Sequence, residues 1–382
     1  MATKTMTADD YRYMARAIRL AEQGLYTTHP NPRVGCVLVR DGEIVGEGFH
    51  RRAGEPHAER NALAEAGERA RGATAYVTLE PCCHHGRTPP CSDGLIEAGV
   101  ARVVVAMTDP NPRVAGQGMA QLEAAGIRVE QGLMRAQAEA LNPGFIVRMT
   151  RGRPYVRCKL AMSLDGRTAM ASGESKWITG PEARRDVQRL RARSDAIVTG
   201  IGTVLADDPS MNVRLTAADL PGVATDAYLL QPLRVVLDPD LQISPSARLL
   251  NLPGETLIVT ASDDQERCQA LQAVGAEVIR LPRAGLGIDL EALLIQLAER
   301  GINEVLIETG PTLAGAAVAA NLVDELVIYA APILMGGDAR GLLHLPGVTE
   351  MKERIDLQIL ELRSVGNDLR VRARPKRINR DG

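Results

Sequence analysis

Three potential metal ligands, His57, Cys82 and Cys91, constrain the fold of this chain more than any other feature. They can bind one ion only if the chain brings together positions that are far apart in the sequence. Helical patterns follow both His57 and Cys91, and a strand from 73 to 79 precedes Cys82. Strands alternate with helices through the first half of the chain. This alternation predicts a three-layer α/β domain with all three donors at strand-to-helix junctions, where helix N-termini favour anionic thiolates.

The ligand set predicts a catalytic zinc ion. One histidine and two cysteines fill three of the four positions around a tetrahedral zinc ion and leave the fourth for water. Glu59 lies two residues after His57, where a carboxylate can move protons without binding the metal. A His-x-Glu motif followed by Pro-Cys and a second Cys is the outline of the zinc-dependent deaminases.

The corresponding mechanism is hydrolytic. A zinc ion lowers the pKa of its bound water to about 7. The resulting hydroxide would attack an amino-bearing carbon of a pyrimidine ring. Glu59 would take the proton of the water and deliver it to the departing ammonia.

Other interpretations of these residues stay open at the level of sequence. His84 or His85 would complete a structural zinc site of four ligands in a binding module, and such a site would leave Glu59 without a role. A deaminase of nucleic acids needs a basic surface and aromatic platforms, whereas the formal net charge is −2 and aromatic residues make up 3%. We therefore expect no nucleic-acid partner. Cys83 should be a bystander, because its side chain should point away from that of Cys82.

Length and patterning predict two cytoplasmic domains. The 382 residues exceed what one core usually spans, so we expect domains at residues 1–150 and 151–382, a linker from Thr150 to Pro154, and a flexible tail from about residue 374. The N-terminus lacks the pattern of a signal peptide, and no apolar run approaches the roughly 20 residues that span a bilayer. The cysteines outside the cluster are isolated, which favours a reducing compartment and no membrane partner.

Local signals place several elements. Thr7 or Asp9 is a credible helix N-cap, and Asp41-Gly42 between two apolar stretches predicts a β-hairpin. The second half is also read as an α/β domain, with a loop from Gly200 to Val204 and a closing hairpin formed by 357–365 and 368–373.

The turn that starts at Gly310 is a candidate phosphate site. Gly310 would let a ligand approach the backbone, and Thr312 with the helix N-terminus would offer donors. The chain has no Gly-x-Gly-x-x-Gly motif here, so a nucleotide would bind by another scheme. The alternative for this half is a scaffold or oligomerisation domain.

Longer motifs resemble one enzyme family, the bifunctional riboflavin-biosynthesis deaminase–reductases. The resemblance covers nearly the whole chain in the family's order. Eight residues separate Cys82 from Cys91, whereas nucleoside deaminases usually have two, and this insert is similar to this family and few others. Cys83 stands where the family usually has Ser. The motifs are Thr28 to Gly35, His57 to Glu59, Pro81 to Cys91, Lys159 to Gly166, Ser175 to Thr179, Thr203 to Pro209 and Glu308 to Thr312.

The resemblance implies two folds and two reactions. The first domain would be a cytidine-deaminase-like α/β/α domain that uses Zn²⁺, and the second a dihydrofolate-reductase-like α/β domain that uses NADPH. The first would replace the 2-amino group of 2,5-diamino-6-(5-phosphoribosylamino)pyrimidin-4-one with oxygen. The second would reduce the ribosyl group of 5-amino-6-(5-phosphoribosylamino)uracil to a ribityl chain. We also expect a homo-oligomer, either a dimer or a tetramer.

The resemblance also implies roles for single residues. Glu59 and Asp207 would be catalytic, and Pro239 departs from the Ser, Thr or Arg that the family often has near the 2′-phosphate of NADPH. The residues that would contact NADPH are Ala161, Trp177, Thr203, Gly310, Pro311, Thr312, Leu313, Ala314, Gly315 and Ala316. Those that would contact the substrate are Asn31, Ser175, Arg191, Asp207, Met211, Arg214 and Glu308, with the two arginines as bidentate phosphate donors and His50, His84 and Arg87 as further contacts.

Overall fold

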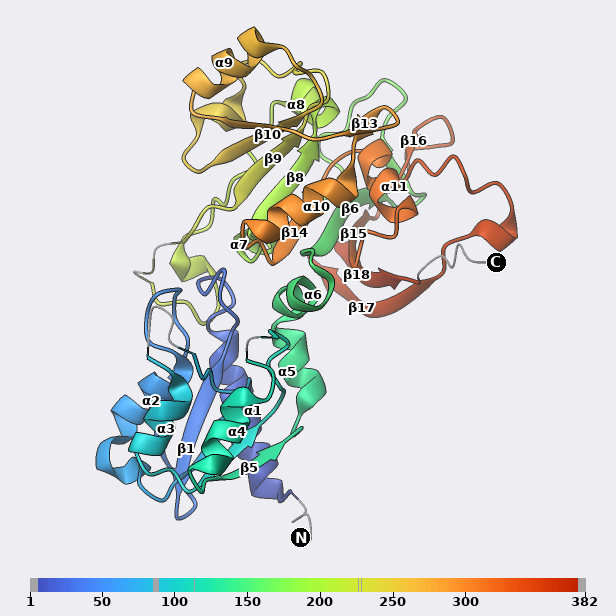
Figure 1. Cartoon of the computed structure of the whole chain (residues 1–382). Coiled ribbons are helices and arrows are strands. Elements are labelled where there is room, and N and C mark those ends of the chain that lie inside the picture. The colour runs from blue at the N-terminus through green and yellow to red at the C-terminus, as the bar shows by residue number, and fades with distance from the viewer. Residues whose placement is uncertain (1–5, 85–88, 113, 226, 228, 377–382) are drawn as a thin grey trace. The chain divides into compact units, whose positions relative to one another are not determined.

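The chain forms two compact units (Figure 1). The computed structural model describes residues 6–84, 89–112, 114–225, 227 and 229–376. Unit 1 consists of Met1–Gly152 together with Thr216–Leu229, and unit 2 of Arg153–Leu215 together with Leu230–Gly382. A short segment from the second half of the chain therefore belongs to the unit that the first half builds.

Unit 1 is built on a five-stranded sheet. Its strands are β1 (Gly35–Arg40), β2 (Glu43–Phe49), β3 (Thr74–Val77), β4 (Arg102–Val105) and β5 (Arg128–Gln131). Their order is β2-β1-β3-β4-β5, in which β1 is antiparallel to β2 and β3, and β4 is parallel to β3 and β5. The hairpin predicted at Asp41-Gly42 is confirmed, and the φ angles of 52° and 83° at these two residues are those of a tight hairpin turn.

Helices cover both faces of this sheet. They are α1 (Ala8–Glu22), α2 (Ala58–Ala66), α3 (Cys91–Glu97), α4 (Gln117–Ala124), α5 (Arg135–Leu141) and α6 (Pro143–Arg151). A Cβ at Gly35 would meet the carbonyl oxygen of Ala17 in α1 at 2.0 Å, and one at Gly48 would meet that of Ala58 in α2 at 2.3 Å. Gly48 pairs with Cys36, the neighbour of Gly35, so the two contacts lie on opposite faces. The predicted three-layer arrangement is confirmed.

Unit 2 contains a larger sheet. Its strands are β6 (Tyr155–Ser163), β8 (Ala196–Gly200), β9 (Leu233–Leu237), β10 (Thr256–Thr260), β11 (Glu277–Arg280), β14 (Glu304–Glu308), β15 (Glu325–Ala331), β17 (Leu357–Val365) and β18 (Asp368–Pro375). Their order is β11-β10-β9-β8-β14-β6-β15-β18-β17, parallel from β11 to β15 and antiparallel beyond. The predicted closing hairpin is confirmed as β17 and β18. Two short ladders pair β7 (Arg167–Ala169) with β16 (Arg340–Gly341) and β12 (Arg283–Ala284) with β13 (Gly287–Ile288).

Two hydrophobic cores lie on the two faces of this sheet. The helices are α7 (Pro181–Ala192), α8 (Ile201–Asp207), α9 (Gln265–Ala273), α10 (Leu290–Glu299) and α11 (Pro311–Ala319). Val198 packs in the core that includes α10 and α11, whereas its neighbour Ile197 packs in the core that includes α7 and α9. Consecutive strand residues point to opposite faces, so each face carries its own helical layer. Across the described residues no helix has the length and apolar character needed to cross a membrane.

Two expectations about elements were wrong, and a third falls largely outside the described residues. Gly200 to Val204 is not a loop, because Gly200 is the N-cap of α8 and the helix begins at Ile201. Thr150 and Arg151 form the last turn of α6 instead of a linker, and Gly152 ends that helix in a left-handed conformation with φ 65°. The expected flexible tail begins inside β18, which continues to Pro375, and residues 377–382 lie outside the described part.

The unit 2 sheet buries a cluster of charges. Arg157 of β6 is 2% exposed and forms ion pairs with Glu304 of β14 and Glu325 of β15. Arg372 of β18 binds the other carboxylate oxygen of Glu325. Burial by itself would raise the pKa of Glu325, but Arg157 and Arg372 lower it below its ordinary value. Arg157 therefore compensates two buried carboxylates at once.

We expect Arg157→Met to lower the free energy of unfolding by about 3 kcal/mol, because methionine fills the space but removes the buried cation that Glu304 and Glu325 share. Arg193 and Arg372 still pair with these carboxylates, which keeps the cost at the low end for a broken buried ion pair. Urea unfolding followed by circular dichroism measures the change. Arg300→Met is the matched control, since Arg300 pairs with Glu277 at the surface, and its cost should not exceed about 1 kcal/mol. Equal costs for the two variants would contradict the assignment.

Candidate functional site

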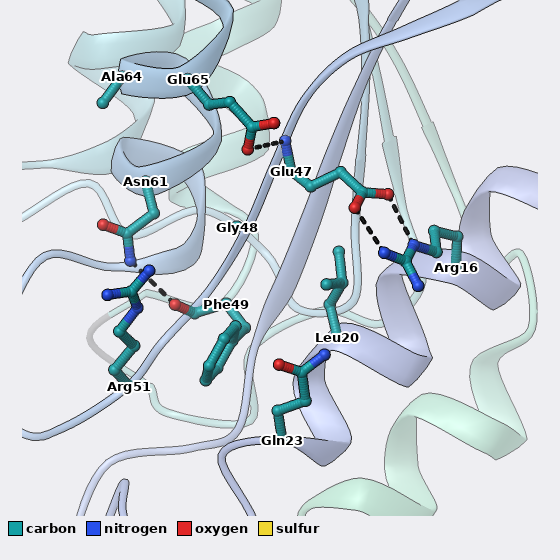
Figure 2. A pocket seen from close by; sticks show the side chains of 10 residues that line it. All are labelled: Arg16, Leu20, Gln23, Glu47, Gly48, Phe49, Arg51, Asn61, Ala64 and Glu65. Atoms are coloured by element: carbon teal, nitrogen blue, oxygen red, sulfur yellow. Dashed lines mark hydrogen bonds and ion pairs between the residues drawn. The ribbon is translucent and has the colours of Figure 1, made fainter. Parts of the chain in front are cut away.

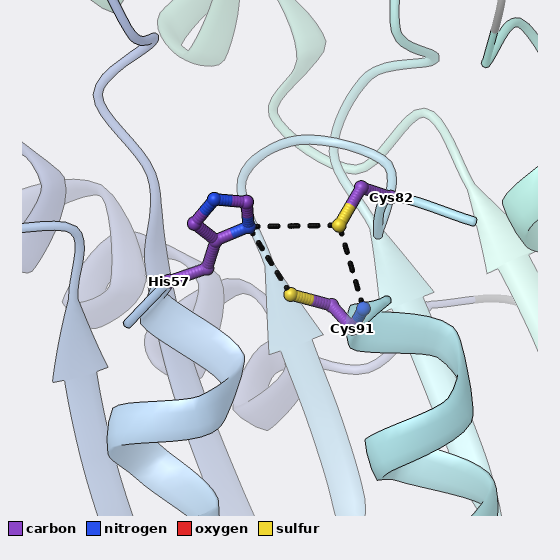
Figure 3. A group of neighbouring side chains, drawn as sticks. All are labelled: His57, Cys82 and Cys91. Atoms are coloured by element: carbon purple, nitrogen blue, oxygen red, sulfur yellow. Dashed lines mark hydrogen bonds between the residues drawn. The ribbon is translucent and has the colours of Figure 1, made fainter. Parts of the chain in front are cut away.

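Three donor side chains from different elements meet in unit 1 (Figure 3). His57 is the N-cap of α2, Cys91 is the first residue of α3, and Cys82 lies in the segment after β3. Nδ1 of His57 lies 3.5 Å from Sγ of Cys82 and 3.4 Å from Sγ of Cys91, and all three donor atoms lie within 4.8 Å of one another. On a tetrahedral zinc ion with ordinary bond lengths, nitrogen and sulfur ligands are about 3.5 Å apart. The three predicted ligands therefore fit one zinc ion, with His57 binding through Nδ1.

The surroundings favour a thiolate on Cys82. The side-chain hydrogen bond with Cys91 is the main cause that lowers the pKa of the Cys82 thiol, and His57 lowers it further. The backbone N–H of Cys91, at the start of α3, also points at Sγ of Cys82 at 3.4 Å. The pKa of the Cys91 thiol is raised in turn, by its hydrogen bond with Cys82 and by burial. A bound divalent cation favours the deprotonated form of both thiols.

Glu59 is a buried carboxyl group beside the three donors. It lies in the first turn of α2 and is 3% exposed. Burial raises its pKa to about 7, and the negative charge of Cys82 adds to this effect. A group that both takes and returns a proton works best when its pKa is close to the working pH. These surroundings are those of the proton carrier that the sequence predicted.

Asn31 is connected to the zinc centre by His50, which contacts both Asn31 and His57. Nδ1 of His50 lies 3.2 Å from the carbonyl oxygen of Pro56, and Nε2 lies 3.0 Å from Nδ2 of Asn31. Because the carbonyl only accepts, Nδ1–H donates to Pro56 and Nε2 accepts from Asn31. The imidazole of His50 also packs edge-on against His57, with ring centroids 5.1 Å apart. His50 is buried and orients Asn31, a role that the sequence did not suggest.

Within the described residues His84 does not complete a four-ligand site, and His85 lies outside them. The donor group among the described residues consists of His57, Cys82 and Cys91 and includes neither Cys83 nor His84. The expectation that Cys83 is a bystander is confirmed. Residues 85–88, with the predicted contact Arg87, lie outside the described part.

A pocket of about 490 Å³ opens elsewhere on unit 1 (Figure 2). Arg16 of α1 donates through Nε and Nη2 to the two oxygens of Glu47 in β2, each at 2.6 Å. Asn61 of α2 donates to the carbonyl oxygen of Phe49 at 2.9 Å. None of the three zinc donors lines this pocket. It lies along edge strand β2 and is not part of the metal centre.

In unit 2, two predicted substrate contacts bind each other. Glu308 is the last residue of β14, and Arg191 of α7 donates to its two oxygens at 2.6 and 2.9 Å. The remaining Nη1 of Arg191 donates to the carbonyl oxygen of Asn212 at 3.1 Å. Burial would raise the pKa of Glu308, but Arg191, Lys159 and Arg214 lower it. Glu308 is therefore a carboxylate among three cations, and the fork of Arg191 predicted to hold a phosphate is taken up by Glu308.

The N-terminus of α11 has the geometry of a ligand-binding turn. Gly310 is its N-cap, and among the described residues no side chain caps the helix and no atom lies within 4 Å of a Cβ placed at Gly310. The first N–H groups of such a helix can bind a phosphate. Further along, Ala314 is buried, and a Cβ at Gly315 would meet the carbonyl oxygen of His344 at 1.9 Å. Ala314 and Gly315 are thus covered, whereas Thr312 and Ala316 are exposed.

The other predicted reductase residues lie on several elements. Asp207 ends α8 and forms an ion pair with Lys176 at 3.0 Å. Trp177 is largely exposed, with the guanidinium of Arg184 4.7 Å from its ring centroid. The side chain of Met211 is buried, so a substrate contact there would come from its backbone.

The remaining positions are distributed as follows. Ala161 lies in β6, Thr203 in α8, and Ser175 in the segment between β7 and α7. Asp238, next to Pro239, is fully buried and accepts two backbone N–H groups at 2.9 and 2.8 Å. Both oxygens of its carboxylate are therefore occupied by hydrogen bonds within the turn.

Lys159 is a residue that the sequence analysis did not select as a site residue. It lies in β6, and its pKa is lowered by burial although Glu308 opposes the shift. A lysine placed directly between the apolar residues Cys158 and Leu160 of a predicted strand was the signal that could have singled it out.

The fold and donors of unit 1 define a zinc-dependent deaminase. Residues 7–107 match the family model described as the cytidine and deoxycytidylate deaminase zinc-binding region, and residues 154–371 match the RibD C-terminal domain. The Riboflavin biosynthesis protein RibD of Escherichia coli (strain K12) is 54% identical over 94% of this chain and 98% of its own length. That of Haemophilus influenzae is 50% identical over 97% of this chain and 99% of its own. The chain belongs to the RibD family of bifunctional riboflavin-biosynthesis enzymes.

Solved structures agree with this assignment. Acinetobacter baumannii RibD, form 1, aligns with a TM-score of 0.88 at 46% identity and covers 97% of this chain and 99% of its own. A deaminase/reductase from Thermotoga maritima aligns with a TM-score of 0.83 at 32% identity and covers 96% and 99%. The predicted pair of folds, cytidine-deaminase-like and dihydrofolate-reductase-like, is confirmed. The protein is a deaminase and a reductase that uses zinc, bound at His57, Cys82 and Cys91, and NADPH.

Proposed function

We propose that unit 1 deaminates 2,5-diamino-6-(5-phosphoribosylamino)pyrimidin-4-one and that unit 2 reduces the ribosyl group of the product to ribityl. The Thermotoga maritima relative is described as a diaminohydroxyphosphoribosylaminopyrimidine deaminase and 5-amino-6-(5-phosphoribosylamino)uracil reductase. The observation that carries the first step is the convergence of His57, Cys82 and Cys91 beside the buried carboxyl group of Glu59.

The residues of unit 1 have separate tasks in the first reaction. His57, Cys82 and Cys91 would hold the zinc ion, which supplies Lewis-acid activation of water when it is bound. Glu59 holds the transferred proton on its carboxyl group. Asn31, oriented by His50, offers a side-chain amide to the pyrimidine or its ribosyl group.

In unit 2 we assign the cofactor to Ala161, Trp177, Thr203 and the first turn of α11. NADPH supplies the hydride when it is bound. Asp207 assists proton transfer at the opened ribose. Glu308 contacts the substrate, with Arg191 holding its carboxylate in place, and Arg214 offers a cation to the phosphate.

One assay tests both steps. The purified protein receives the diaminopyrimidine substrate with and without NADPH, and ammonia release and NADPH oxidation are followed separately. Ammonia release should not need NADPH, and NADPH oxidation should follow it. An absence of ammonia release from the zinc-loaded protein would refute the assignment of the first step.

Asp207→Asn should lower the rate of NADPH oxidation by about 10²–10⁴-fold, the usual contribution of a positioned acid or base. Ammonia release should remain unchanged, because unit 1 does not use Asp207. Asp208→Asn is the matched control: Asp208 is adjacent, has φ 40°, and accepts from the backbone of Arg248. Asparagine tolerates that backbone and keeps the acceptor. Equal losses in the two variants would argue against a catalytic Asp207.

We also propose a cytoplasmic homo-oligomer. None of the six cysteines forms a disulfide, which supports a reducing compartment. Edge strand β17 exposes Ile359 and Leu362, at 57% and 64%, and such an edge favours pairing with a second copy. Light scattering of the purified protein measures the assembly, and a monomer at micromolar concentration would contradict it.

A further inference from the structure

Secondary structure does not fix the position of Cys82. His57 and Cys91 are attached to helices, as the N-cap of α2 and the first residue of α3. Cys82 lies five residues beyond the end of β3, in a segment without regular structure. A thiolate that must stay within bonding distance of a metal needs support from outside the ligand set.

The first turn of α3 provides part of this support. The backbone N–H of Cys91 donates to Sγ of Cys82 at 3.4 Å, and that of Ser92 donates to the Cys82 carbonyl oxygen at 3.2 Å. The same turn carries Cys91, so it positions both thiols. The geometry of the pair of thiols therefore depends on what holds this turn in place.

Gln121 of α4 holds that turn through two consecutive residues. Its Nε2 donates to Asp93 at 2.6 Å, which leaves Oε1 to face Ser92. The hydroxyl of Ser92, which is fully buried, lies 2.8 Å from Oε1 of Gln121 and 3.1 Å from the carbonyl oxygen of Cys82. A hydroxyl has one proton, and the shorter contact receives it. Gln121 thus ties α4 to the turn that supports Cys82.

Glu80, which precedes Cys82 in the chain, fixes the position of the start of α4. Its carboxylate is 3% exposed and accepts four backbone N–H groups, from Asp109, Gly116, Gly118 and Met119, at 3.0 to 3.3 Å. The N-cap of α4 is Gly116, which has no side chain, so Glu80 supplies the missing cap. The carboxylate fixes the start of the helix that carries Gln121.

The backbone of α4 also packs directly on the ligand segment. A Cβ at Gly118 would meet the carbonyl oxygen of Pro81 at 2.0 Å, and Pro81 is the residue before Cys82. The helix therefore contacts the chain on both sides of Cys82. It contacts Glu80 and Pro81 before that residue, and Ser92 after it.

We propose that Glu80 and Gln121 are positioning residues of the zinc centre. They act through α4, a helix that contributes no ligand. Glu80 caps α4 beside the Pro81-Cys82 segment, and Gln121 locks the first turn of α3 against it. Together they hold the two thiolates at the separation that one zinc ion requires.

The test is the zinc affinity of the full-length protein, measured by competition with a chromogenic chelator. Outer-shell partners of metal ligands typically contribute about 10–100-fold to affinity, so Gln121→Ala should weaken zinc binding by about that factor. Gln117→Ala is the matched control, because Gln117 is an exposed residue of the same helix without such contacts in the described structure. NADPH oxidation in the same samples reports that unit 2 is intact.

Two further variants separate positioning from general stability. If Gln121 acts through Ser92, the double variant Ser92→Ala/Gln121→Ala should weaken zinc binding by less than the product of the two single effects. Glu80→Gln keeps the shape but turns an amide toward N–H donors, and it should weaken zinc binding by a similar factor. If Glu80→Gln fails to fold, the Gln121 and Ser92 variants still test the proposal. Variants that unfold more easily but bind zinc as tightly as the unaltered protein would overturn the proposal.

Discussion

Glu59→Gln should lower the rate of ammonia release by about 10²–10⁴-fold while the protein keeps its zinc. Glutamine has nearly the shape of glutamate but cannot take the proton of the attacking water or return it to the leaving amine. Glu59 is not one of the three donors that meet at the metal position, so the ligand set stays complete. Metal analysis of the purified variant and an ammonia assay at saturating substrate measure the two quantities.

Two controls make this result specific to the zinc centre. NADPH oxidation with the deaminated pyrimidine as substrate should be unaffected, because that reaction belongs to unit 2. Glu65→Gln removes an exposed carboxylate from the same helix, one oxygen of which accepts from the backbone N–H of Glu47 at 3.0 Å. Ammonia release should be retained in that variant. A full deaminase rate in Glu59→Gln would show that another group carries the proton.

Cys82→Ser should lose most of its zinc and with it the release of ammonia, whereas Cys83→Ser should keep both. The two positions are adjacent, but only Cys82 meets His57 and Cys91. A serine hydroxyl is a poor replacement for a thiolate on zinc, because the ligand must be deprotonated. The zinc content per chain and the deaminase rate are compared for both variants.

The reductase again serves as the internal control for this pair. Both variants should oxidise NADPH at the unaltered rate when given the deaminated product. Zinc loss from Cys83→Ser as large as that from Cys82→Ser would mean that the ligand assignment is wrong. An unfolded unit 1 in Cys82→Ser would instead favour a structural role for the metal.

The zinc centre could be predicted from the sequence because zinc binding depends on which types of side chain are present. His57, Cys82 and Cys91 are among the few side chains that bind zinc, and Glu59 is chemically distinct from all three. The hairpin at Asp41-Gly42 was predictable for a related reason, since a two-residue turn depends only on the backbone freedom of those two residues. Such local determinants do not need knowledge of the fold.

Contacts between distant segments were not accessible in this way. Arg191 and Glu308 were each expected to contact substrate, but they bind each other across 117 positions of the chain. Which charged groups meet depends on the strand order, in which β14 lies between β8 and β6. The loop predicted from Gly200 to Val204 was wrong because glycine is common both in loops and at the ends of helices, and only the packing decides between them.

The motif from His57 to Cys91 shows which features depend on the sequence alone and which depend on the tertiary structure. By itself the sequence determined which side chains bind zinc, which carboxyl group is expected to carry protons, and which enzyme family the chain resembles, because these depend on chemical identity and spacing. Only the tertiary structure decided that Nδ1 of His57 faces the two thiols, that His50 hydrogen-bonds Asn31, and that α4 contacts the first turn of α3. These features rest on hydrogen-bond geometry between segments that are far apart in the chain, and that geometry exists only once the sheet has set their places.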